Sequence, residues 1–285
     1  MKRILLILCL LAAGMTAWAQ SRIVTDSIRS EVLRCEQKYN VYLPAGYDAA
    51  KEYPVLYLLH GLYGDYSNWA KVGGMKAVAD ELILSGEVSP MVIVMPNAGD
   101  NDVHHYQNGY FNVQDWPYED FFFQEFLPAV EKKYHCGESK GRRALAGLSM
   151  GGGGAVVYAQ RHPDLFSSAY GMSAWLDNKH REVRGSSQPG SKLSITDESV
   201  RAHSALDFMD AASPETIHKL KTVEWFLDCG DDDSLMLLSV DLHLKMKKAG
   251  LHSELRVRDG NHTWEYWHTA LRTSLPFASR NFDRK

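Results

Sequence analysis

The sequence predicts an α/β protein with a mostly parallel central sheet and helices on both of its faces. Short apolar runs that fit strands buried on both faces alternate with longer segments of helical periodicity. Strands that alternate with helices form parallel sheets, and functional groups gather at the carboxyl ends of those strands. The 285 residues are 45% hydrophobic and 23% charged, which fits a soluble globular chain rather than a disordered or fibrous one.

The first 19 residues have the features of a secretory signal peptide. Lys2 and Arg3 precede the apolar run 4–13, and residues 17–19 read Ala-Trp-Ala, a small-x-small cleavage pattern. We expect cleavage after Ala19 and a mature protein, residues 20–285, that forms one domain and is secreted or periplasmic. The apolar run is shorter than the roughly 20 residues that cross a bilayer, so we expect no membrane span.

Charge and cysteine content argue against several partners and cofactors. Residues 1–19 carry two basic and no acidic residues, so their removal leaves 29 basic and 35 acidic residues, a net charge of −6. This charge argues against nucleic acid or an anionic membrane as the partner. Cys35, Cys136 and Cys229 remain, so at least one thiol stays unpaired. Their spacing matches no zinc site, and we interpret them as buried structural cysteines and expect no metal.

The strands are expected in the following order. Segment 31–47 reads as two strands and a turn, because Tyr39, Val41 and Leu43 alternate before a proline and a glycine. Four apolar runs then each end in a glycine-bearing or polar loop, and a final strand precedes the last helix. These five strands are expected within 53–61, 90–99, 142–149, 222–230 and 252–259.

Helical periodicity fills most of the stretches between the strands. In 118–134, Phe122, Phe126 and Val130 recur at four-residue intervals, the spacing of one helix face. Segment 173–214 is instead polar and rich in Ser, Asp and Gly. We interpret it as an irregular excursion over the carboxyl edge of the sheet, either a lid or a wall of the substrate site. The remaining helices are expected at 75–84, 154–161, 235–248 and 266–271.

The stretch Gly147-Leu148-Ser149-Met150-Gly151 lies between a predicted strand and a predicted helix. This is the setting of a nucleophile elbow, in which a G-x-S-x-G turn presents a serine at the edge of the sheet. Side chains at the glycine positions would collide in so sharp a turn. No Lys-Ser or Lys-Thr follows, which excludes a P-loop, and no G-x-G-x-x-G register fits a dinucleotide site. We therefore predict that Ser149 is a nucleophile.

A serine nucleophile needs a general base and a carboxylate that orients the base, in the chain order Ser, Asp or Glu, His. His262 follows the last predicted strand, and the only later histidine, His268, falls within the last helix. The acid lies among the four aspartates of 228–233. Asp228 belongs to the strand, Asp231 and Asp232 are typical turn residues, and Asp233 lies furthest along the loop.

An oxyanion hole and a substrate surface complete the predicted site. The N–H of Met150 is the expected first oxyanion donor, and the N–H of Leu62, in the loop after an earlier strand, is the second. His60, in the same loop, is interpreted as a structural hydrogen-bonding residue. Aromatic side chains near the cleft could stack on a sugar or an aryl ring. They are Trp69, Tyr106, Tyr110, Trp175 and Trp264, of which Tyr110, Trp175 and Trp264 are the candidate substrate contacts.

Four stretches together resemble one esterase family of α/β-hydrolases, which includes the feruloyl and acetylxylan esterases of carbohydrate esterase family 1, S-formylglutathione hydrolases and mycolyltransferases. They are VYLPAGYDAAKEYPVLYLLHGLYGDYSNW, AGLSMGGGGA, DCGDDDSL and GNHTWEYW. The resemblance implies the α/β-hydrolase fold and no cofactor. It identifies Asp233 as the acid, the third residue after the glycine of the Cys-Gly turn. It also matches Ser149, His262, Leu62 and Met150 to the roles given above.

Within this family the signal peptide and the stretch LHGLYG favour the carbohydrate esterases, since the thioesterases typically carry a serine before that glycine. We therefore expect a secreted serine esterase that acts through an acyl-enzyme on acetyl or feruloyl esters of a polysaccharide or oligosaccharide. Three alternatives stay open: a thioesterase like S-formylglutathione hydrolase, an acyltransferase with a sugar acceptor, and a non-catalytic carbohydrate-binding protein.

Overall fold

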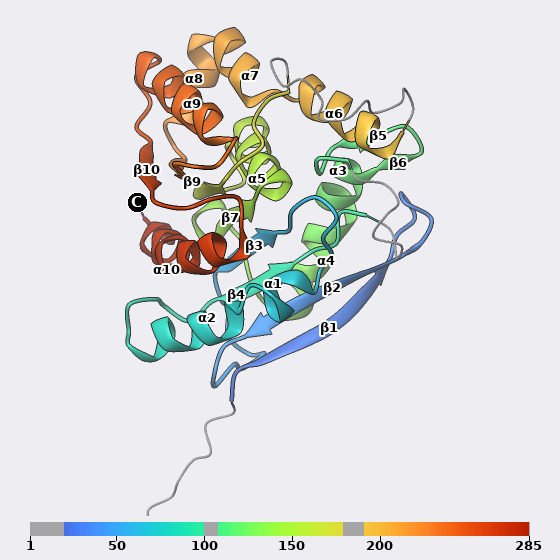
Figure 1. The fold of residues 1–285 in the computed structure, drawn as a ribbon. Coiled ribbons are helices and arrows are strands. Elements are labelled where there is room, and N and C mark those ends of the chain that lie inside the picture. The colour runs from blue at the N-terminus through green and yellow to red at the C-terminus, as the bar shows by residue number, and fades with distance from the viewer. Residues whose placement is uncertain (1–19, 100–107, 179–190, 285) are drawn as a thin grey trace, which may run out of the picture.

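The computed structural model describes residues 20–99, 108–178 and 191–284 (Figure 1). Eight strands form one sheet in the order β1-β2-β4-β3-β7-β8-β9-β10. β2 pairs antiparallel with both β1 and β4, and all other neighbours are parallel, so this is the predicted α/β-hydrolase fold. The strands are β1 (Arg22–Arg29), β2 (Glu36–Leu43), β3 (Val55–Leu59), β4 (Val92–Met95), β7 (Arg143–Leu148), β8 (Ser168–Met172), β9 (Glu224–Gly230) and β10 (Glu254–Arg258). A separate hairpin pairs β5 (Asn112–Val113) with β6 (Trp116–Pro117).

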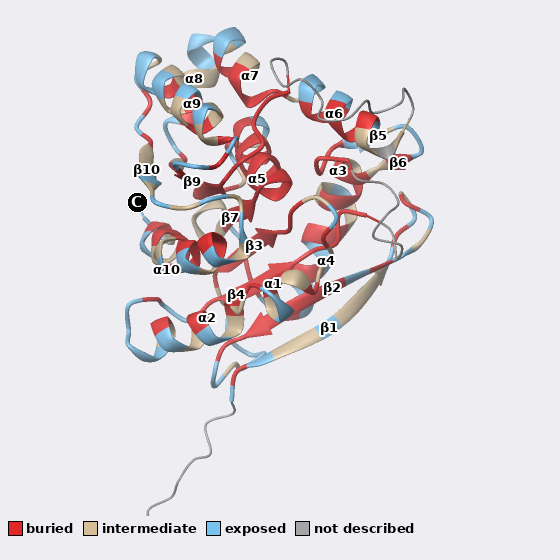
Figure 2. Cartoon of the chain, in the orientation of Figure 1, coloured by how far each residue is buried: buried red, intermediate tan, exposed pale blue. Residues whose placement is uncertain are grey.

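Helices cover both faces of the sheet, as predicted. α2 (Met75–Leu84) and α10 (Trp264–Asn281) pack together on one face, and α5 (Met150–Arg161) and α9 (Met236–Lys248) lie on the other. The central strands between them are buried, while the outer sides of α7, α8 and α9 are exposed (Figure 2). The other helices are α1 (Asn68–Lys71), α3 (Tyr118–Phe121), a π-helical turn (Phe122–Phe126), α4 (Leu127–Tyr134), a 3₁₀ turn (Lys140–Arg142), α6 (Lys192–Ala202), α7 (Ala205–Ala211) and α8 (Pro214–Leu220).

Two predictions about these elements are wrong. Residues 31–35 form a bend, and the first strand lies earlier, in β1, an edge strand without a continuous apolar run. The segment 173–214 is not irregular throughout, because it contains α6, α7 and the start of α8. Each of these helices begins after a serine whose side chain accepts a hydrogen bond from a backbone N–H three residues later. Serines that suggested a loop are helix N-caps.

Several predictions concern the chain start and the cysteines. The expected signal peptide, residues 1–19, and Tyr106 lie outside the described residues. Within the described ranges, no helix combines the length and apolar character needed to cross a membrane. Cys136 and Cys229 are buried, and neither forms a disulfide, whereas Cys35 is half-buried. Burial raises the pKa of both buried thiols, that of Cys229 to about 12, so these two are structural, as predicted.

Candidate active site

Five neighbouring parallel strands end at one edge of the sheet and bring the predicted site residues together. In spatial order the strands are β3, β7, β8, β9 and β10. The loops after their carboxyl ends carry, in the same order, Leu62, Ser149, Trp175, Asp233 and His262. Residues far apart in the sequence are therefore neighbours because their strands are neighbours.

Ser149 occupies the sharp turn between β7 and α5. Its backbone has φ 53° and ψ −116°, a strained conformation that residues other than glycine rarely adopt. A Cβ at Gly147 would lie 2.3 Å from the carbonyl oxygen of Gly151, and a Cβ at Gly151 would lie 2.5 Å from that of His60. The two glycines of the motif therefore permit backbone contacts that any side chain would prevent, which is the nucleophile elbow that the sequence predicts.

Ser149, His262 and Asp233 form a hydrogen-bonded chain. His262 Nε2 lies 2.9 Å from Ser149 Oγ, and His262 Nδ1 lies 2.7 Å from Asp233 Oδ2. An ionised carboxylate can only accept, so the proton of the neutral imidazole is assigned to Nδ1. Nε2 then has a lone pair directed at the serine hydroxyl. This arrangement can remove a proton from Ser149.

The environment of Asp233 keeps its carboxyl group ionised. Its side chain is 0% exposed, and its Oδ1 accepts a hydrogen bond of 2.9 Å from the N–H of Leu235. Burial by itself raises the pKa of this carboxyl, but the hydrogen bonds from His262 and Leu235 outweigh burial and hold the pKa below its ordinary value. The carboxylate can therefore orient the imidazole and stabilise a positive charge on it.

The other three aspartates of the loop have different surroundings. Asp228 belongs to β9, as predicted, and its buried carboxylate accepts hydrogen bonds from the hydroxyls of Tyr170 and Tyr266. Asp231 accepts from the N–H of Gly260 at 3.0 Å, which ties this loop to the loop that carries the histidine. Asp232 is exposed at the cleft. Of the four, Asp233 is the one in contact with the imidazole.

The predicted oxyanion donors, the N–H groups of Met150 and Leu62, belong to segments that adjoin Ser149. Met150 is the first residue of α5, so the helix does not use its amide, which lies at the positive end of the helix dipole. Leu62 follows Gly61 in the loop after β3, and Gly61 lies beside Leu148 and Ser149. Neither amide donates a hydrogen bond to another residue in the described part of the chain.

His60 has a structural place in the same loop, as predicted. Its Nε2 accepts a hydrogen bond of 3.0 Å from the N–H of Ala98, and its Nδ1 donates to the carbonyl oxygen of Gly61 at 2.8 Å. Burial lowers the pKa of His60 to about 4. The ring is therefore neutral at physiological pH and fixes the backbone that carries Leu62.

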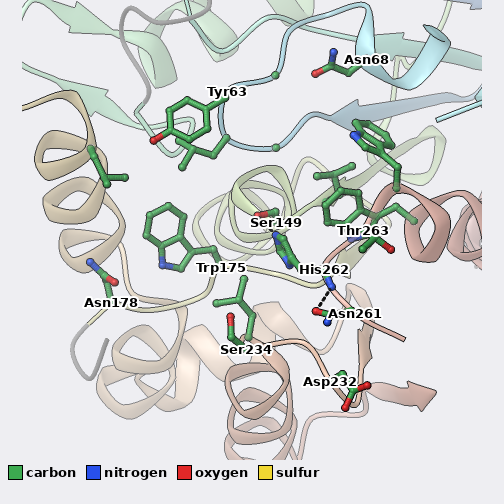
Figure 3. Close-up of a pocket in the computed structure, with 18 of the residues that line it drawn as sticks. Tyr63, Asn68, Ser149, Trp175, Asn178, Asp232, Ser234, Asn261, His262 and Thr263 are labelled. Atoms are coloured by element: carbon green, nitrogen blue, oxygen red, sulfur yellow. Dashed lines mark hydrogen bonds between the residues drawn. The ribbon is translucent and has the colours of Figure 1, made fainter. Parts of the chain in front are cut away.

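A cleft of about 1060 Å³ opens over Ser149 (Figure 3). Trp175 and Trp264 line it, as predicted, but Tyr110 does not. The prediction for Tyr110 is wrong because its ring is fully buried and its hydroxyl donates to the carbonyl oxygen of His60 at 2.9 Å, within the core. Trp69 is also in the core, where its Nε1 donates to a carbonyl oxygen of β3 at 3.0 Å.

Three residues of the site were missed in the sequence. Tyr63 lines the cleft with 59% of its surface exposed and a φ of 60°, and its position directly after His-Gly-Leu could have indicated it. Trp267 packs edge-on against the His262 ring, with 4.9 Å between ring centroids, and so restrains the imidazole. Asn178 lines the cleft beyond Trp175. No sequence signal marks Trp267 or Asn178.

Besides His262, the ionisable side chains with a formal charge in the described cleft lining are two aspartates. They are Asp197, on α6, and Asp232, after β9, and no described lysine or arginine lines the cleft. Leu193 of α6 and Asn178 also line it, so the segment 173–214 contributes a wall of the cleft where it is described. No group of three or more His, Cys, Asp or Glu residues in the described ranges could hold a metal ion.

Comparison with known proteins agrees with this geometry and assigns the class. Residues 30–278 match the family model described as "Putative esterase". Together with the fold, this match defines the protein as a carboxylic ester hydrolase. The chain belongs to this esterase family, which the sequence resemblance had indicated.

The individual relatives include a ferulic acid esterase, an S-formylglutathione hydrolase and a xylanase/feruloyl esterase. A solved ferulic acid esterase is 45% identical, with a TM-score of 0.88 over 93% of this chain and 100% of its own. An S-formylglutathione hydrolase from Staphylococcus aureus is 19% identical, with a TM-score of 0.74 over 92% of this chain and 100% of its own, which shows the shared fold alone. An endo-1,4-beta-xylanase/feruloyl esterase of Xylanibacter ruminicola is 34% identical over 135 residues, 46% of this chain and 18% of that protein. The matches cover 11% to 27% of the curated relatives' lengths.

Proposed function

We propose that this esterase is exported and hydrolyses feruloyl or acetyl esters on polysaccharide, with Ser149 as nucleophile, His262 as general base and Asp233 as the orienting acid. The observation that carries the proposal is the hydrogen-bonded chain of 2.9 Å and 2.7 Å at the carboxyl edge of the sheet. The 45% identity to a ferulic acid esterase over nearly the whole chain supports the feruloyl group. The signal-like residues 1–19 support export.

In the first step the serine is acylated. Ser149 Oγ attacks the ester carbonyl carbon while its proton passes to His262 Nε2. The negative charge that develops on the carbonyl oxygen is stabilised by the N–H groups of Leu62 and Met150. His262 then gives the proton to the alcohol oxygen, the carbon–oxygen bond breaks, and the saccharide leaves with its hydroxyl restored.

In the second step water removes the acyl group. A water molecule gives a proton to His262 Nε2 and attacks the acyl carbon, and the same two amides stabilise the second oxyanion. Collapse of this intermediate returns the proton to Ser149 Oγ and releases the carboxylic acid. Asp233 remains ionised in both steps and stabilises the imidazolium that forms transiently in each of them.

The charge of the cleft favours a neutral ester over a glutathione thioester. Glutathione carries two carboxylates and one ammonium group, whereas feruloyl and acetyl esters of neutral sugars carry no charge. The exposed carboxylate of Asp232 at the cleft disfavours a substrate with net negative charge. The volume of about 1060 Å³ is also ample for an aryl acyl group with part of a sugar.

The test is hydrolysis of a substrate panel by the purified protein and by its Ser149→Ala variant. The panel contains p-nitrophenyl acetate, methyl ferulate, acetylated xylan and S-formylglutathione. We expect turnover of methyl ferulate or acetylated xylan that is lost in the variant. Turnover of S-formylglutathione alone would overturn the proposal in favour of a thioesterase. If acyl transfer to an added sugar exceeds hydrolysis, the protein is an acyltransferase with the same three residues.

A further inference from the structure

The acyl and alcohol sides of the cleft can be told apart by the position of the general base. His262 Nε2 must reach the alcohol oxygen to protonate it, so the alcohol part of the ester lies on the His262 side of Ser149. The acyl group therefore extends in the other direction. In Figure 3, Trp175 lies on the side of Ser149 away from His262, and Asn178 lies further out in the same direction.

Trp175 is fixed to the backbone of the nucleophile. Its N–H donates to the carbonyl oxygen of Ser149 at 2.9 Å, and the N–H of Ser149 donates to the carbonyl oxygen of Met172, at the end of β8, at 2.8 Å. The residue is only 6% exposed, and a Cβ at Gly153 would lie 2.2 Å from its carbonyl oxygen. Trp175 therefore forms an aromatic wall of the cleft beside Ser149, and its backbone contacts fix its position relative to the serine.

Asn178 has a buried hydrogen-bond acceptor with no protein partner. The residue is 4% exposed, yet it lines the cleft. Its Nδ2 donates to the carbonyl oxygen of Asp197 at 3.4 Å, and its own N–H donates to Asp177 Oδ1 at 2.7 Å. Because Nδ2 faces a carbonyl oxygen, the opposite atom of the amide is Oδ1, and no described group donates to it.

A buried polar atom without a partner is costly, and such atoms in native structures call for an explanation. Oδ1 has less than 1 Å² of exposed surface, so a substrate hydroxyl reaches it only when the adjoining wall of the cleft shifts, while the bond to α6 holds the amide in place. We propose that Asn178 is a specificity-determining residue whose Oδ1 accepts a hydrogen bond from the ring hydroxyl of a 4-hydroxycinnamoyl group bound along Trp175. This inference rests on the proposed function and selects the hydroxycinnamoyl class over the acetyl class.

The test compares matched substrates in the wild-type protein and in two variants. Methyl 4-hydroxycinnamate carries a hydroxyl that can donate to Oδ1, whereas methyl 4-methoxycinnamate lacks this donor and is larger by one methyl group. We expect kcat/KM to favour the hydroxy ester about tenfold or more in the wild type, because the methoxy ester leaves the acceptor unpaired. Asn178→Leu should reduce this preference to about twofold or less, and Asn178→Asp, which keeps an acceptor, should retain it.

Circular dichroism and thermal unfolding serve as the control for folding of both variants, and hydrolysis of p-nitrophenyl acetate, whose acetyl group is too short to extend along Trp175, reports whether the catalytic residues still act. Equal kcat/KM for the two cinnamates in the wild type would overturn the role of Asn178 while leaving the esterase proposal intact. So would a preference that survives in Asn178→Leu. Hydrolysis of p-nitrophenyl acetate with no turnover of any cinnamate or acetylated polysaccharide would instead overturn the proposed function, and this inference with it.

Discussion

Replacement of Asp233 by asparagine tests the orientation of the imidazole with almost no change in shape. Asp233 Oδ1 accepts from the N–H of Leu235, so the amide oxygen of an asparagine takes that place and its NH₂ faces His262. Nδ1 must then accept a hydrogen bond from this NH₂ group, so the imidazole proton moves to Nε2. There it prevents His262 from removing the Ser149 proton. The reverse orientation of the amide would press NH₂ against the N–H of Leu235 in a buried site. That orientation would keep the proton on Nδ1 but is disfavoured, so the orientation that disables the base predominates.

We expect kcat of Asp233→Asn to fall about 10⁴-fold, equivalent to about 5 kcal/mol in the activation free energy. The assay is hydrolysis of p-nitrophenyl acetate at pH 7.5, with Asp232→Asn as the matched control. Asp232 lies one residue away and is exposed at the cleft, so its variant should keep kcat within about twofold. The reasoning is refuted if Asp233→Asn keeps more than about a tenth of kcat, or if the two variants lose equal activity.

Two further predictions concern stability. His60 has a pKa of about 4 in the folded protein, below 6.5 in the unfolded chain, so the unfolded state binds the proton first. The neutral form of His60 therefore contributes about 3 kcal/mol to the free energy of unfolding. This contribution is fully present above pH 6.5 and is lost as the pH falls through 4. Urea unfolding of His60→Gln should therefore depend less on pH between 7 and 4.5 than that of the wild type, and equal slopes would contradict this. Gly151→Ala places a Cβ 2.5 Å from a backbone oxygen. It should lower the free energy of unfolding, measured with urea, by about 1–3 kcal/mol. Gly141→Ala, whose nearest contact would be 3.8 Å, should be neutral by comparison.

The three residues of the proposed triad could be predicted because local signals place each of them at the end of a strand. The glycines around Ser149 lie between an apolar strand and a helix, which indicates a nucleophile elbow. The turn residues around Asp233 and His262 likewise follow apolar strands. Parallel pairing then brings these ends together without any knowledge of distant contacts. The choice of Asp233 needed the family resemblance, and the structure agrees because its carboxylate alone among the four contacts the imidazole.

Other features depend on tertiary contacts that the sequence does not display. β8 reads Ser-Ala-Tyr-Gly-Met, which is too rich in small residues to stand out as an apolar run, and it is a strand because β7 and β9 pair with it. Tyr110 looked like a cleft aromatic, but its hydroxyl finds a carbonyl oxygen in the core. Asn178 could not be identified from the sequence, because an asparagine in a polar segment is usually an exposed loop residue. Only its burial beside α6 marks it as a candidate for substrate contact.

The helix that follows Ser149 has four consecutive buried glycines, Gly151–Gly154, directly after its first residue, Met150. Each glycine in a helix interior is about 1 kcal/mol less favourable than alanine, so this turn has no stability of its own. It exists because neighbouring backbone lies against it, including the carbonyl oxygens of Met172 and Trp175. Ser149 therefore keeps its strained conformation only while the neighbouring strands and loops are packed against this turn. A partly unfolded chain lacks the positioned serine, so esterase activity should report on completed folding.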